Sequence, residues 1–153
     1  MAIWFAENPK VDDANASQAG LLAPHLGIRF TEFGDDFLRA TMPVEPHTRQ
    51  PMGYLHGGAS LVLAETVGSV AANFVVDRSK HRCMGQEINA NHLRPVAEGL
   101  VTGTARPFHI GTRSQVWNIE IRDPRERLVC ISRLTMAVID WRPQATTDKG
   151  NWK

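Results

Sequence analysis

The feature that most constrains this chain is the run of residues 57–76, in which apolar side chains occupy nearly every face of a helix. Such a helix must be covered on all sides, because apolar surface left in water costs roughly 25 cal/mol per Å². Shorter stretches with strand-like patterns lie before and after it. The run therefore predicts a buried central helix around which the rest of the chain is wrapped.

The flanking stretches predict an antiparallel sheet. Residues 26–33 and 37–44 alternate apolar and polar side chains around a turn at 34–36, which indicates a hairpin. Four more strand-like stretches follow the helix, at 84–93, 100–108, 113–122 and 128–139. Short connections favour antiparallel pairing, so one sheet and one helix form a two-layer α+β domain. A short helix over 17–23 is expected to end before Pro24.

Size and charge point to a single domain with a small-molecule or protein partner. The chain has 153 residues, of which 42% are hydrophobic, and 17 Lys and Arg against 16 Asp and Glu give a net charge of +1. We expect one domain over 17–139, a peripheral N-terminal segment over 1–16 and a polar C-terminal tail over 140–153. The scattered basic residues provide no electrostatic footprint for nucleic acid or an anionic membrane.

Targeting and metal-binding signals are absent from the sequence. No apolar run approaches the roughly 18 residues of a transmembrane helix, and the N-terminus does not read as a secretory signal, so we expect a cytoplasmic protein. Cys83 and Cys130 belong to no C-x-x-C pair and are interpreted as reduced structural thiols. No metal-ligand spacing such as H-x-x-E-H occurs, so no metal is expected.

Three polar residues interrupt the apolar helix on one face. Glu65, Ser69 and Asn73 stand at positions i, i+4 and i+8. A carboxylate among apolar neighbours should be partly desolvated, which tends to raise its pKa and makes it a functional candidate. An ion pair with an arginine of a second subunit explains such a glutamate equally well.

The start of the helix carries His56-Gly57-Gly58 and no Ser or Asp cap. Free backbone N–H groups and the positive end of the helix dipole suit an anion or a developing oxyanion, and glycines let a ligand approach closely. The glycines also fit a simple tight transition from loop to helix, and His56 fits a structural histidine. Gln50, on the same loop, can place an amide near the helix start.

Taken together, these motifs resemble a known family. Residues 50–69, 87–94 and 109–117 are similar to the hotdog-fold acyl-CoA thioesterases, in particular the phenylacetate-pathway, dihydroxynaphthoyl-CoA hydrolase and hydroxybenzoyl-CoA thioesterase branch. The resemblance covers residues 26–139. It implies an antiparallel sheet of five to six strands wrapped around one long helix, and hydrolysis of an acyl-CoA, with an aryl-CoA favoured. Coenzyme A is then part of the substrate, and no cofactor is expected.

The resemblance also assigns roles to individual residues. Glu65 matches the catalytic carboxylate, Gly57 the backbone oxyanion donor, and Gln50 and His56 the groups that orient the thioester and the helix start. Ser69 stands where the hydroxybenzoyl-CoA enzymes carry a threonine. Candidates for the phosphates of CoA, each of which also fits an ordinary solvated surface, are His92, Arg94, His109, Thr112 and Arg113.

Alternatives remain open at this point. Glu65 can attack the thioester as a nucleophile or activate water as a general base. A hotdog hydratase or dehydratase, or a non-catalytic acyl-CoA-binding domain, also fits the fold. Gly57 and Glu65 are eight residues apart, about 12 Å along one helix, so both cannot touch one thioester. We therefore predict a homodimer or a dimer of dimers whose active sites are shared between chains.

Overall fold

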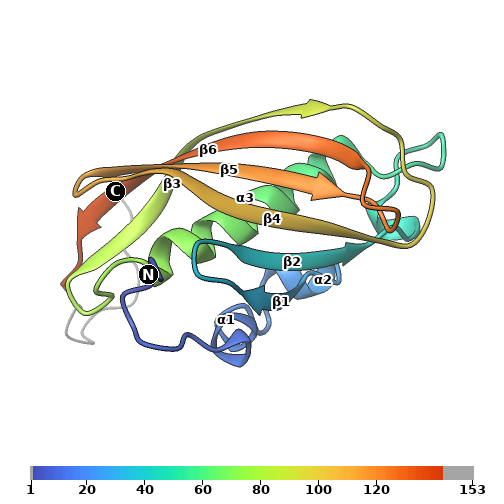
Figure 1. Ribbon diagram of the computed structural model, residues 1–153. Helices are drawn as coiled ribbons and strands as arrows, with labels where there is room; N and C mark the ends of the chain where they lie inside the picture. Colours follow the sequence, from blue (N-terminus) through green and yellow to red (C-terminus); the bar gives the residue numbers. More distant parts are fainter. Residues whose placement is uncertain (1, 143–153) are drawn as a thin grey trace, which may run out of the picture.

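The computed structural model describes residues 2–142, which form a six-stranded antiparallel sheet wrapped over one long helix (Figure 1). The strand order is β1-β2-β4-β5-β6-β3, so β1 and β3 are the edge strands. The strands are β1 (Arg29–Phe33), β2 (Leu38–Pro43), β3 (His81–His92), β4 (Leu100–Ile110), β5 (Ser114–Arg122) and β6 (Leu128–Asp140). The predicted α+β architecture is confirmed.

The central helix α3 (Gly57–Phe74) matches the predicted apolar run to within two residues at its C-terminal end. It lies under the sheet and crosses it obliquely (Figure 1). The sheet buries the inward side chains of its middle strands, including Trp117, Ile119, Ile121 and Leu134, against the helix. One hydrophobic core therefore joins the helix to the sheet.

Two glycines allow α3 to approach the sheet closely. A Cβ atom on Gly68 of α3 would lie 2.6 Å from Cδ2 of Leu134 and 3.3 Å from Cδ1 of Ile119. On the sheet, a Cβ on Gly103 would lie 3.1 Å from Cγ of Leu63. Because these neighbouring side chains are fully buried, they have little room to move. The glycines set the distance between the two layers.

The strands follow one another along the chain as predicted, and the predicted first hairpin is present. The β1–β2 hairpin pairs Phe33 with Leu38 across the turn, as expected from residues 34–36. The strand β3 pairs with β6 on one side only, and its register shifts at a bulge between Gly85 and Glu87. Most of its residues are exposed. The long strand β3 therefore has one side of its backbone unpaired within the chain.

The N-terminal region differs from its prediction. The helix expected over 17–23 is absent, and two short helices lie on either side of most of that range, α1 (Val11–Ala16) and α2 (Leu22–His25). Pro24 lies inside α2, where it is tolerated because first-turn N–H groups have no partner within a helix. A single 3-10 turn, η1 (Pro46–Thr48), follows β2.

The segment 1–16 was expected to be peripheral, and its described residues contribute to the core. Trp4 donates from Nε1 to the Gly34 carbonyl at 2.7 Å and packs edge-on against Phe33. The side chain of Asn15 forms two hydrogen bonds with the backbone of Phe30, at 2.9 and 3.1 Å. These contacts tie the segment to β1. Of the tail expected over 140–153, residues 143–153 lie outside the described part.

Within residues 2–142, no helix is both long and apolar enough to cross a membrane.

The helix-to-sheet distance can be tested with Gly68→Ala. Alanine favours a helix over glycine by about 1 kcal/mol, but overpacking a buried site costs about 1–3 kcal/mol. We therefore expect a net loss of about 1 kcal/mol in the free energy of unfolding, measured by urea titration. Thr66→Ala, on a half-buried position of the same helix, should leave the value unchanged or slightly higher. A Gly68→Ala protein as stable as wild type would show that the layers are not in tight contact there.

Candidate active site

The N-terminus of α3 is capped by a side chain that the sequence analysis did not expect to act as a cap. The Gly58 N–H donates to Nδ1 of His56 at 2.8 Å, and the His56 N–H donates to the Thr48 carbonyl at 2.9 Å. The expectation that all the first N–H groups are free is therefore wrong for Gly58. Since Nδ1 accepts this bond, the neutral imidazole carries its proton on Nε2.

Two backbone donors at this helix start remain available. Within residues 2–142, the N–H groups of Gly57 and Ala59 have no hydrogen-bond acceptor. They lie in the first turn, where the helix dipole is positive and attracts negative charge. The helix start therefore has fewer free N–H donors than the sequence indicated, and the oxyanion role of Gly57 stays a prediction.

His92 lies directly against Gly57. A Cβ atom on Gly57 would be 2.8 Å from Nε2 of His92, which is the last residue of β3. His92 was predicted as a candidate for the phosphates of CoA, and its position beside the helix start was not expected. The structure places His92 beside the helix start because the end of β3 runs next to the beginning of α3. Glycine at position 57 leaves room for this imidazole.

Gln50 belongs to the turn that leads into the helix. Its backbone N–H donates to the Tyr54 carbonyl at 2.8 Å, and the Gly53 N–H donates to the Gln50 carbonyl at 2.9 Å. The side-chain Oε1 of Gln50 accepts a hydrogen bond from the Met52 N–H. This bond fixes the amide group and leaves its NH₂ group without an acceptor among residues 2–142. Gln50 can therefore donate to a ligand.

Glu65 is exposed in the isolated chain, which corrects the expectation of a desolvated carboxylate. Its Oε1 lies 2.7 Å from where a Cβ on Gly85 would be, so the carboxylate extends across the backbone of β3. Within the described residues it forms no salt bridge. The apolar neighbours in sequence face the sheet, while Glu65 points toward the open edge.

Of the other two residues of the polar helix face, Asn73 is bonded to β3 and Ser69 contacts β6. Asn73 donates from Nδ2 to the carbonyls of Ser69 and Cys83 at 2.9 and 3.0 Å, and its Oδ1 accepts from the Cys83 N–H at 2.9 Å. Ser69 Oγ lies 3.8 Å from the sulfur of Met136. The polar face therefore attaches the edge strand to the helix, with Glu65 as its free end.

The residues proposed for CoA fall into two separate groups. His92 pairs with Cys130 at the start of β6, and the Arg94 N–H contacts the Val129 carbonyl at 3.3 Å. His109, Thr112 and Arg113 lie on or beside the β4–β5 hairpin, next to the other end of β6, where the Val138 N–H donates to the Arg113 carbonyl at 2.9 Å. One chain does not bring the two groups together.

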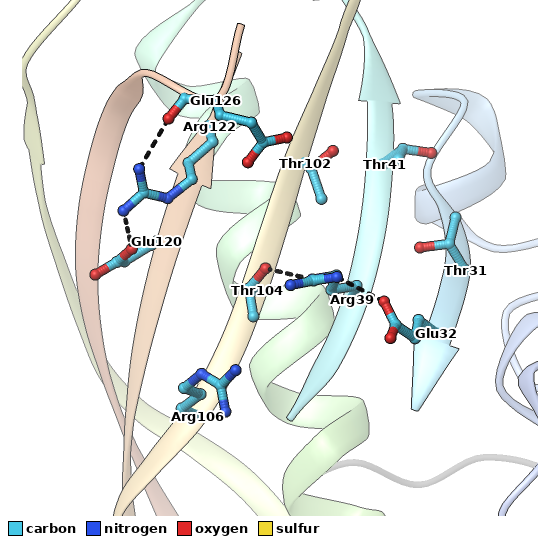
Figure 2. Close-up of a pocket in the computed structure, with 10 residues that line it drawn as sticks. All are labelled: Thr31, Glu32, Arg39, Thr41, Thr102, Thr104, Arg106, Glu120, Arg122 and Glu126. Atoms are coloured by element: carbon cyan, nitrogen blue, oxygen red, sulfur yellow. Dashed lines mark hydrogen bonds and ion pairs between the residues drawn. The ribbon is translucent and has the colours of Figure 1, made fainter. Parts of the chain in front are cut away.

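A polar groove of about 670 Å³ lies on the face of the sheet that points away from α3 (Figure 2). Its charges largely neutralise one another, since Arg39 pairs with Glu32 at 2.6 Å and Arg122 with Glu120 at 2.7 Å. Figure 2 shows threonines between these pairs, among them Thr102. None of the predicted site residues lines this groove, so it is separate from the candidate active site.

Both cysteines are free and buried, as expected for structural thiols. Burial raises the pKa of the Cys83 thiol to about 11. Burial also raises the pKa of Cys130, against the opposing effect of a hydrogen bond with Ser132. A raised pKa keeps both thiols protonated at neutral pH, so neither acts as a nucleophile.

The sheet wrapped around α3 and the two glycines at the start of this helix indicate the class of protein to which the chain belongs. A family model described as the thioesterase superfamily matches residues 52–130, and the chain belongs to this family. It has the hotdog fold and is a hydrolase of thioesters. This finding supports hydrolysis over the hydratase and binding-domain alternatives.

Individual relatives are close in sequence and in structure. The 1,4-dihydroxy-2-naphthoyl-CoA hydrolase of Escherichia coli is 52% identical over 82% of this chain and 91% of its own length. A crystal structure of a thioesterase from Pseudomonas aeruginosa has a TM-score of 0.89 and 46% identity, covering 92% of this chain and all of that one. A thioesterase of Staphylococcus aureus has a TM-score of 0.73 and 35% identity, covering 76% and 96%.

Proposed function

We propose that this protein hydrolyses aryl-CoA thioesters at two identical sites, each shared between the chains of a homodimer that can pair further into a dimer of dimers. Glu65 of one chain provides the carboxylate, and Gly57 of its partner provides the oxyanion donor. The observation that carries the proposal is that both groups lie against the edge strand β3, Gly57 at His92 and Glu65 at Gly85.

Pairing of two β3 strands across a two-fold axis would bring the separated groups together. The exposed edge of β3 offers a row of unpaired backbone groups, and antiparallel pairing satisfies them. An axis between Ile88 and Asn89 sets Gly85 of one chain opposite His92 of the other. Glu65 of one chain then faces Gly57 of its partner, and the site repeats on the other side of the axis.

The same axis accounts for the two groups of CoA candidates. In one chain, His92 and Arg94 lie at one end of β6, and the β4–β5 hairpin with His109 and Arg113 lies at the other. Antiparallel pairing of β3 places the opposite ends of the two sheets side by side. The hairpin of one chain then approaches Arg94 of its partner, so that both groups, Thr112 included, surround one CoA.

The chemistry follows from the donors and the carboxylate. In the general-base form, Glu65 takes a proton from water, the hydroxide oxygen bonds to the thioester carbon, and the Gly57 N–H stabilises the resulting oxyanion. Collapse of this intermediate breaks the C–S bond, and the CoA thiolate recovers the proton from Glu65. In the nucleophilic form, Glu65 itself bonds to the carbon and expels the thiolate, and water then hydrolyses the anhydride.

The remaining site residues have supporting roles in this scheme. The free amide NH₂ of Gln50 donates to the thioester, since its oxygen is already held by the Met52 N–H. His56 shapes the helix start through its bond to Gly58, and Ser69 lies one turn beyond Glu65. Two crystal structures are known for variants of the Staphylococcus aureus relative. In one an alanine replaces a glutamine, and in the other an alanine replaces a glutamate. That glutamine and that glutamate are separated by the same number of positions as Gln50 and Glu65.

The aryl substrate is supported by similarity to a hydrolase whose name specifies 1,4-dihydroxy-2-naphthoyl-CoA. We expect a higher kcat/KM for aromatic thioesters than for long straight-chain ones, measured by release of free CoA thiol. A panel of benzoyl-, hydroxybenzoyl-, phenylacetyl-, dihydroxynaphthoyl- and palmitoyl-CoA tests this. Preference for palmitoyl-CoA over every aromatic member would contradict the aryl assignment and leave thioester hydrolysis intact.

Glu65→Gln tests the carboxylate. Glutamine keeps the shape of glutamate and cannot act as base or nucleophile, so kcat should fall by on the order of 10² or more while thioester binding persists. Glu98→Gln, at another exposed position, serves as the matched control and should retain wild-type kcat. Activity of Glu65→Gln within about threefold of wild type would make Glu65 a structural residue.

Mixing inactive subunits tests the shared site. Heterodimers of Glu65→Ala and Gln50→Ala chains contain one doubly altered site and one intact site, so about half of the wild-type activity per dimer should return. Heterodimers of wild type with the Gln50→Ala/Glu65→Ala double variant should be nearly inactive, because each site then lacks one group. Sites built within single chains would give the reverse pattern: no recovery in the first mixture and half-activity in the second.

A further inference from the structure

A pocket of about 480 Å³ lies between the C-terminal half of α3 and the start of β3. Ser69 and Met84 line it, and Met84 is the neighbour of Gly85, across which the Glu65 carboxylate extends. The pocket therefore begins within one helical turn of the proposed catalytic carboxylate. Its walls are largely apolar and include Val70, Phe74 and Trp141.

Two arginines line the same pocket. The Cζ atom of Arg78 lies 4.6 Å from the centre of the Phe74 ring, and that of Arg82 lies 5.0 Å from the centre of the Trp141 ring. Arg82 also donates from Nη1 to the His81 carbonyl at 3.0 Å. The same Nη1 also donates to the Arg78 carbonyl. Stacking on a ring face restrains a guanidinium group, and the Nε and Nη2 donors of Arg82 have no acceptor among residues 2–142.

Neither arginine is neutralised inside the described part of the chain. Among residues 2–142, no carboxylate forms an ion pair with Arg78 or Arg82, whereas Arg39, Arg106, Arg122 and Arg127 are all paired. The pocket therefore combines apolar walls with two restrained positive charges that have no carboxylate partner among residues 2–142. This combination suits a ligand with an apolar body and an anionic end.

We propose that this pocket holds the acyl group of the substrate and that Arg78 and Arg82 select acyl groups whose far end carries a carboxylate. The proposal rests on the proposed function, because it takes Glu65 as the point where the thioester reacts. Gly85 stands three positions after Arg82 in β3, which is about 10 Å along the strand. A naphthoyl group with a carboxylate on its remote ring fits this span, and Arg–carboxylate pairs are among the strong hydrogen-bonded contacts.

The apolar walls argue for the acyl group over the CoA portion as the occupant. The phosphates of CoA lie on the other side of the thioester from the acyl group, and every CoA thioester carries them. Arginines that bound CoA would therefore act equally on all substrates. Arginines that bind the acyl terminus act only on acyl groups with an anionic end, and this difference is measurable.

The test compares two thioesters that differ only in the remote carboxylate, 6-carboxy-2-naphthoyl-CoA and 2-naphthoyl-CoA. Wild type should hydrolyse the carboxylated substrate with a kcat/KM higher by about tenfold or more. The Arg78→Gln/Arg82→Gln variant should lose this preference and keep its kcat/KM for 2-naphthoyl-CoA within about threefold of wild type. Arg133→Gln, at an exposed position of β6, is the matched control and should keep the preference.

A binding measurement separates this proposal from the proposed function. Naphthalene-2,6-dicarboxylate should bind wild type more tightly than 2-naphthoate by calorimetry, and the double arginine variant should lose the difference. If neither thioester is hydrolysed while this arginine-dependent binding holds, the proposed function fails and the pocket assignment stands. The pocket assignment would be overturned if wild type hydrolysed both thioesters with the same kcat/KM. It would also be overturned if the double arginine variant lost kcat/KM equally on both substrates.

Discussion

The close packing of α3 on the sheet is the contact on which the rest of this structure depends. Gly68 on the helix and Gly103 on β4 remove the side chains that would hold the layers apart, and buried residues such as Leu134 and Leu63 fill the remaining space. Because the interior is packed to crystal-like density, the orientation of the helix is restricted once these contacts form. The polar face with Glu65 and Asn73 is then directed toward the edge strand β3.

The edge strand links the fold to its proposed chemistry. Asn73 holds the beginning of β3 through its backbone bonds to Cys83, the middle of β3 passes under Glu65, and its end places His92 against Gly57. A rigid helix keeps Gly57 and Glu65 about 12 Å apart. In the proposed function, a second chain pairs with the unpaired side of β3, and this association would bring Gly57 of one chain to Glu65 of the other.

The two electrostatic environments of the molecule differ in a way that bears on specificity. On the outer face of the sheet, Arg39 and Arg122 are paired with glutamates, and the groove between them presents little net charge. Beside α3, Arg78 and Arg82 are held by aromatic rings and have no carboxylate partner among residues 2–142. Of these two environments, the second is the one that presents arginines without a carboxylate partner among residues 2–142 to an anionic acyl terminus.

The central helix, the succession of strands along the chain and the motif residues could be predicted from the amino-acid sequence, because these depend on local periodicity and on short turn signals. The apolar run before Phe74 and the turn at 34–36 are such signals. Only the tertiary structure decided that His56 caps Gly58, that Glu65 is exposed, and that His92 lies against Gly57. These features depend on contacts between residues far apart in the chain or on the direction of one side chain, and neither is encoded in the spacing of residue types along a sequence.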